Sequence, residues 1–173
     1  MTLKLHKNNA SLARQKFERV RSHLAPILGS RVMIEHVGST ALPDVDGKGI
    51  IDVMIAYPSP RDLPVIVDLL SKNGYFAARD AAEHTERVFM ASRLEDTVEG
   101  DIHLHIVRAG SLAAKQFIAV REYFLSHPAD AREYSETKHA IAAASHYERE
   151  EYKKRKSEFM KKILEKIASE TTR

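Results

Sequence analysis

The sequence predicts an α/β (α+β) fold in which a small mixed sheet of about four or five strands is flanked by helices. Short β-branched runs alternate with two helical patterns up to residue 110, and only helical patterns follow. A length of 173 residues with 43% hydrophobic content suits one globular domain with a sizeable core. We therefore expect a single domain over 1–173, with a sheet core in 1–110 and a helical part in 111–173 that closes a cleft.

Two amphipathic helices and five strand-like runs account for the first part of the chain. An asparagine pair at 8–9 can cap a helix over 9–28, and a glycine ends that helix. A second helix follows the turn at 58–60 and ends at an Asn-Gly pair near residue 73. The predicted strands are 31–37, 50–56, 75–79, 87–92 and 101–107, with connections at 80–85 and 93–100.

Three helices are predicted in the C-terminal part, over 112–126, 129–146 and 147–168. The last of them begins with interspersed glutamates, lysines and arginines, a mixture that is typical of a solvated helix face with i,i+4 ion pairs. The alternative is that basic residues of the helices lean over the cleft and neutralise phosphates. The residues in question are Arg121, Lys138, Lys153 and Lys156.

The stretch 36–55 joins a glycine turn to a strand that carries one acid. Gly38 allows close approach of the backbone, and the N–H groups and hydroxyls of Ser39 and Thr40 suit a phosphate cradle. Asp52 lies inside the next strand, where a buried carboxylate is costly unless it is hydrogen-bonded, paired or bound to metal. The simpler interpretation is an ordinary turn, with Asp52 bonded to a nearby amide.

A second group of polar side chains follows strict alternation in the strand 101–107. Asp101, His103 and His105 are predicted to share one face, opposite Ile102, Leu104 and Ile106. Imidazoles with a carboxylate could bind zinc, manganese or iron. The alternative is a half-exposed strand whose histidines bond to their neighbours.

Composition excludes several classes of protein. The absence of cysteine excludes disulfides, a thiolate nucleophile and a zinc–thiolate site. No apolar run reaches the length of a membrane span, and no signal-peptide pattern is present, so we expect a cytoplasmic protein. RNA or DNA binding is not expected, because acids dilute the formal charge to +3 and aromatics do not interleave with the basic residues.

Several short motifs recur in one order along nearly the whole chain. They are His36-Val-Gly-Ser-Thr40, Lys48-Gly-Ile-Ile-Asp52, His103-Leu-His105, Arg121-Glu-Tyr-Phe-Leu125, His127-Pro128, and Tyr134 with Lys138. Together they resemble the GrpB family, a branch of the nucleotidyltransferase (DNA polymerase β-like) superfamily. The chain departs from the family where Gly49 replaces the proline that usually follows Lys48.

This resemblance implies a nucleotidyltransferase-like fold and assigns roles to the residues. Gly38 and Ser39 would hold the nucleotide phosphates, and Asp52 with Asp101 or His105 would hold a divalent metal, magnesium, manganese or zinc. The superfamily places a second acid two residues after the first, where this chain has Met54. A thioether is a poor ligand for magnesium.

Three functions remain open from the sequence. The leading prediction is transfer of an NMP from an NTP to an unknown acceptor, with Lys48 and the helical basic residues neutralising the leaving pyrophosphate. The second is an inactive module that binds a nucleotide or another phosphorylated small molecule. The third is a metal-dependent phosphoester hydrolase at Asp101, His103 and His105.

Overall fold

The computed structural model describes residues 4–77, 87–92, 101–146 and 148–171. Within these residues the centre is a five-stranded mixed sheet in the order β1-β2-β5-β4-β3. Only the central pair, β2 with β5, is parallel among the described strand pairs. The strands are β1 (Met33–Val37), β2 (Ile51–Tyr57), β3 (Tyr75–Ala77), β4 (Arg87–Ser92) and β5 (Ile102–Arg108).

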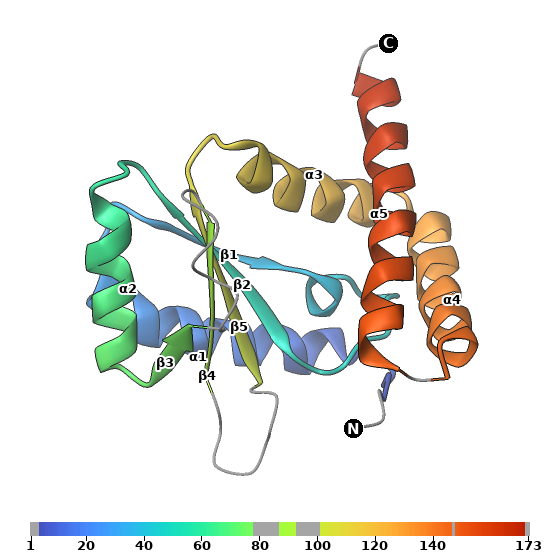
Figure 1. Cartoon of the computed structure of the whole chain (residues 1–173), viewed down its shortest axis with the longest axis horizontal. Helices are drawn as coiled ribbons and strands as arrows, with labels where there is room; N and C mark the ends of the chain where they lie inside the picture. Colours follow the sequence, from blue (N-terminus) through green and yellow to red (C-terminus); the bar gives the residue numbers. More distant parts are fainter. Residues whose placement is uncertain (1–3, 78–86, 93–100, 147, 172–173) are drawn as a thin grey trace.

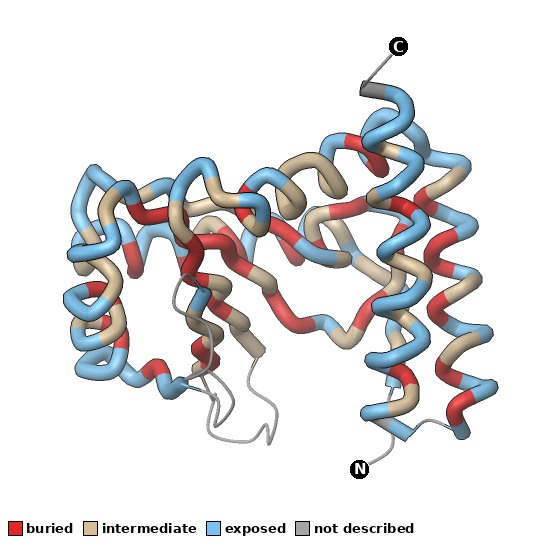
Figure 2. The backbone as a smooth tube through the Cα atoms, turned by 45° about the horizontal axis from the view of Figure 1, so that its top comes forward, coloured by how far each residue is buried: buried red, intermediate tan, exposed pale blue. Residues whose placement is uncertain are grey.

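Helices cover both faces of the sheet and one of its ends. α1 (Ala10–Leu28) and α2 (Asp62–Lys72) pack on one face through the largest apolar cluster. α3 (Leu112–Ser126) covers the other face. α4 (Pro128–Ala144) and α5 (Arg149–Thr171) lie side by side at the end of the molecule opposite α2 (Figure 1). Buried segments follow the strands between these layers (Figure 2).

Alternation along β2 assigns its side chains to the two layers. Val53 and Ile55 are fully buried under α1 and α2. Met54 is equally buried on the other face, among apolar residues of α3 and β5. Asp52 shares the face of Met54, as strand periodicity requires. The acid is therefore presented toward α3 and the C-terminal helices.

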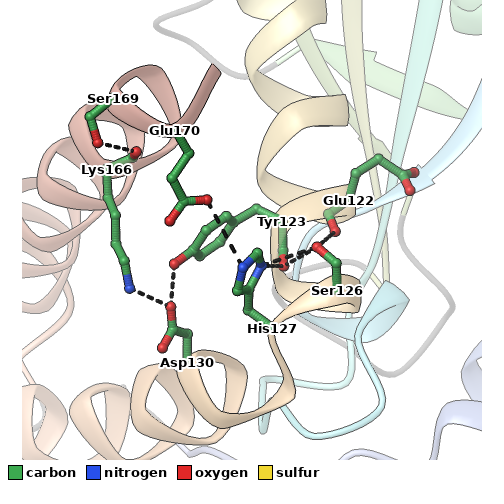
Figure 3. A network of polar contacts seen from close by, with 8 residues as sticks. All are labelled: Glu122, Tyr123, Ser126, His127, Asp130, Lys166, Ser169 and Glu170. Carbon is green, nitrogen blue, oxygen red and sulfur yellow. Dashed lines mark hydrogen bonds and ion pairs between the residues drawn. The ribbon is translucent and has the colours of Figure 1, made fainter. Parts of the chain in front are cut away.

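The three C-terminal helices are joined by aromatic stacking and by a polar network. The rings of Phe124, Tyr134 and Phe159 stack nearly parallel, with centroids 5.0 and 5.4 Å apart. Asp130 of α4 accepts hydrogen bonds from the Tyr123 hydroxyl of α3 and from Lys166 of α5 (Figure 3). These contacts fix α4 and α5 against α3, and so fix what the helices present toward the sheet.

The structure confirms the predicted fold class and most element boundaries. Asn9 caps α1 by accepting a hydrogen bond from the Leu12 amide, and Gly29 ends the helix. The predicted limits 87–92 and 112–126 agree with β4 and α3. The predicted strand 75–79 is described only to Ala77, and the connections 80–85 and 93–100 lie outside the described residues. None of the described helices is long and apolar enough to cross a bilayer.

Candidate functional site

The Gly38–Ser39 turn and the Asp52 carboxylate lie against each other where β1 meets β2. Asp52 pairs with Val37 across the two strands, directly before the turn. Gly38 has φ 72° and ψ −168°, a backbone region that is essentially limited to glycine. A Cβ atom at Gly38 would also overlap the side chain of Asp52. This position therefore needs glycine for its backbone and for the approach of the carboxylate.

Two histidines of β5 hold the Asp52 carboxylate. His105 Nε2 lies 3.1 Å and His103 Nδ1 lies 3.4 Å from Oδ1 of Asp52. Burial would raise the pKa of Asp52, but hydrogen bonds from His103 and His105 hold that pKa well below its usual range. Asp52 is thus a carboxylate at neutral pH, and its side chain remains 24% exposed. The acid inside the strand is satisfied by imidazoles and still reaches a cavity.

A cavity of about 290 Å³ separates this end of the sheet from the C-terminal helices. Gly38, Ser39 and Asp52 form its floor. Apolar side chains of α3 and α5 form much of its wall: Phe117, Val120, Met160 and Leu164. A concave site with an apolar wall and a few polar groups is the form that small-molecule sites take.

Three cationic side chains line the cavity, and they differ in how they are paired. Lys156 of α5 has no hydrogen bond or ion pair with the residues that the structure describes. Arg121 of α3 is bound to Glu35, at 2.8 Å, and to Glu122, at 2.9 Å. The third cation, Arg87 of β4, lies over the ring of Phe117. Lys156 and Arg87 are therefore the cations most available to a ligand.

Lys138 of α4 places a buried ammonium group directly behind the turn. The residue is 3% exposed, and its Nζ donates a hydrogen bond to the Asp46 carbonyl. A Cβ atom at Gly47 would overlap Ser39 Oγ and would lie 3.7 Å from Lys138 Nζ, so these two groups meet at Gly47. Burial, with a smaller contribution from the charge of Lys156, lowers the pKa of Lys138 to about 7.

The cavity brings together only part of the predicted set of residues. Gly38, Ser39, Asp52, Arg121 and Lys156 line it. Lys138 lies behind the residues that line the cavity. Lys48 is close to Lys138, because its charge helps to lower the pKa of Lys138, although by less than burial and Lys156 do. His103 and His105 reach the site through Asp52.

Two predicted residues take other places. Thr40 is buried, and its hydroxyl donates to the Ile50 carbonyl and contacts His36, so it serves the turn. Lys153 does not line the cavity: it is 54% exposed and pairs with Glu150, as expected of a solvated helix face.

Asp101 does not line the cavity, and among the described residues its carboxylate interacts with Tyr75. Burial raises the pKa of the Tyr75 phenol, and the nearby Asp101 carboxylate raises it further. Tyr75 belongs to the core under α1 and α2, on the other side of the sheet from Asp52. Asp101 precedes β5, so strand alternation does not govern its side chain. The grouping of Asp101 with His103 and His105 therefore stays a prediction from the sequence.

Sequence reasoning missed Arg87 and Gln116 as lining residues. Arg87 is the first residue of β4, and Gln116 lies in the first half of α3. Alternation does place Arg87 on one face with Phe89. Asp52 lies on the same face of the sheet, but this follows from the pairing of β4 with β5, a tertiary contact that local sequence patterns do not give.

The donor groups around Asp52 do not fit a two-metal centre. Met54 occupies the position of the second acid and is fully buried among apolar side chains. One oxygen of Asp52 is already engaged by two imidazoles. In the described part of the chain, no group of three or more His, Asp or Glu side chains could hold a metal ion.

The contact between Gly38 and Asp52 can be tested against a matched glycine. Gly29 has a similar backbone, φ 75° and ψ 179°, but nothing lies near the position of its Cβ. Gly29→Ala should lower the free energy of unfolding by about 1–3 kcal/mol through backbone strain alone. Gly38→Ala should lower it further, because the new methyl group displaces Asp52. Equal losses in urea unfolding would contradict the close approach.

Comparison with known proteins agrees with this architecture. The crystal structure of the conserved protein GrpB from Enterococcus faecalis superposes with a TM-score of 0.82 at 22% identity, over 98% of this chain and 100% of that one. The Cid1 structure described for RNA terminal uridylyl transferase activity superposes with a TM-score of 0.56 at 15% identity, over 79% of this chain and 41% of that one. The fold is therefore nucleotidyltransferase-like.

Sequence relatives come from several bacteria. A UPF0157 protein of Pseudomonas aeruginosa is 36% identical over 155 residues, 89% of this chain and 62% of that protein. One of Streptomyces coelicolor is 28% identical over 73% of this chain and 64% of its own length. The chain thus spans less than two thirds of these two relatives. The sequence profile of the GrpB protein family matches residues 4–166, and the chain belongs to that family.

Proposed function

We propose that this protein binds the phosphate groups of a nucleotide, or of another phosphorylated small molecule, in the cavity beside Asp52. The observation that carries the proposal is the meeting of the Gly38–Ser39 turn with Lys156 and the buried Lys138 at one end of that cavity. Two ammonium groups from two different helices converge on a glycine turn that allows close approach of a ligand. Phosphate oxygens are the ligands that such groups bind best.

The charge around the turn supports an anionic ligand. Two other lysines, Lys156 and Lys48, lie close enough to Lys138 for their charges to help lower its pKa. Asp52 and Asp46 oppose them, and Asp52 is already hydrogen-bonded to His105. A bound phosphate would add negative charge beside Lys138 and Lys156. The protein's part in binding is then to hold the cations and the hydroxyl of Ser39 in position before the ligand arrives.

Nucleotidyl transfer is the second candidate. It is supported by the nucleotidyltransferase-like fold and by the position of Asp52, which lines the cavity next to the turn. The buried Met54 and the imidazoles on Asp52 favour binding over transfer, because they leave the site with one acid. The two candidates differ in the role of Asp52: in a binding site it repels the anionic ligand, and in a transferase it helps to bind the NTP together with a metal ion.

Lys156 should contribute more to phosphate binding than Lys153, one turn away on the same helix. Lys156→Gln should weaken the binding of inorganic tripolyphosphate by about tenfold, because it removes one charge-assisted contact. Lys153→Gln is the matched control and should leave binding nearly unchanged, since that side chain is exposed and paired with Glu150. Isothermal titration calorimetry measures both. Equal weakening by the two substitutions would move the ligand to the outer face of α5.

Binding should also depend on pH through Lys138. The pKa of Lys138 is about 7 in the free protein, and a bound anion favours its charged form. Binding near and above pH 7 should therefore take up a proton, and affinity should fall as the pH rises through about 7. Calorimetry in buffers of different ionisation heat measures the uptake. Lys138→Met, measured beside the wild type, should lose it, whereas unchanged uptake in that variant would exclude Lys138.

Asp52→Asn separates the two candidate functions by the sign of its effect. If the site only binds phosphates, removal of the carboxylate should strengthen tripolyphosphate binding by roughly fivefold, since a repulsion of about 1 kcal/mol is lost. If the site transfers nucleotides, the same substitution should weaken the binding of an NTP in the presence of magnesium or manganese. Titrations with and without the metal distinguish these results, and we expect the first.

A further inference from the structure

Arg87 marks a second charged end of the same cavity. Arg87 pairs with Val107 and Asp52 pairs with His103, so the two residues are two strands and four positions apart in the sheet. Four positions along a strand correspond to about 13 Å. Phe117 of α3 lies between the two ends, with its ring 4.9 Å from that of His105 and 5.5 Å from the Arg87 guanidinium.

Within the described residues, the guanidinium of Arg87 has little part in holding the fold together. It makes no hydrogen bond or ion pair with any residue that the structure describes, and its described contact is the face of Phe117. Arg121, the other arginine of the cavity, is held by Glu35, Glu122 and the His36 carbonyl. A planar guanidinium that lies on an aromatic ring keeps its fork of N–H donors free for a carboxylate or phosphate.

Gln116 adds an uncharged donor and acceptor to the cavity. Its side-chain amide has no hydrogen-bond partner among the described residues. Gln116 neighbours Phe117 on α3, and the small Ala113 lies one turn before it. Arginine, glutamine and an aromatic face together make a set that can orient a small polar molecule.

We propose that the Arg87 end is a second subsite, which binds the carboxylate or phosphate group of a second small molecule while phosphates occupy the end at Ser39 and Lys156. This inference rests on the proposed function. A nucleotide carries its negative charge at its phosphate end, and its base is uncharged. If the phosphates lie against Ser39 and Lys156, a cation on a residue four positions further along the strands is not needed by that ligand. Arg87, which has no ion pair among the described residues, therefore fits the oxyanion of another molecule.

The test follows each subsite separately. The Nε–H resonance of Arg87 is identified by NMR as the arginine signal that is missing from the Arg87→Gln variant. The protein is then titrated first with tripolyphosphate and afterwards with succinate or inorganic phosphate in the millimolar range. With tripolyphosphate bound, succinate or phosphate should shift the Arg87 resonance to saturation. Arg87→Gln should weaken this second step by about tenfold and leave the tripolyphosphate step unchanged. Arg61→Gln, which removes an exposed arginine of the α2 cap, should change neither step.

The outcomes separate the two proposals. Lys156→Gln should weaken the tripolyphosphate step and spare the second one. If tripolyphosphate does not bind but succinate or phosphate still shifts Arg87 to saturation, the proposed function fails and the second subsite stands. If neither anion shifts Arg87, or if tripolyphosphate alone shifts Arg87 fully and blocks succinate, the second subsite is overturned.

Discussion

The buried ammonium group of Lys138 is the contact on which the site depends. It lies on α4, is 3% exposed, and donates to the Asp46 carbonyl in the loop that follows the turn. Ser135 and His139 of the same helix also bond to Asp46. Burying a charge is costly unless opposite charge or a ligand compensates for it. The same group thus holds the helical part against the sheet and keeps positive charge beside the cavity.

Asp52 lies in a nucleotidyltransferase-like fold, but its surroundings differ from those of a two-metal site. The carboxylate lies against the glycine turn, within a fold that is nucleotidyltransferase-like. Two imidazoles lie against this carboxylate, whereas magnesium prefers oxygen ligands. Met54 is part of the apolar core under α3. These features support the proposal of phosphate binding over that of a two-metal reaction.

Local sequence patterns predicted the elements well because caps, turns and periodicity act over a few residues. They also placed Asp52 and Met54 on one face, since strand alternation is geometric. The helical lysines could not be sorted in this way: Lys153 and Lys156 are one turn apart, and the docking of α5 decides that only Lys156 reaches the cavity. Alternation does not fix the side chain of Asp101, because Asp101 precedes β5, and Arg87 was missed because its place in the cavity depends on strand pairing.

A crystal structure of the protein with tripolyphosphate bound is the most direct measurement, because it locates the phosphorus atoms. We predict phosphate oxygens within hydrogen-bonding distance of the Ser39 hydroxyl and of Lys156 Nζ, with Asp52 still bonded to His105. Phosphate bound only to the exposed basic face of α5, around Lys153, with the cavity filled by water, would contradict a phosphate site beside Asp52.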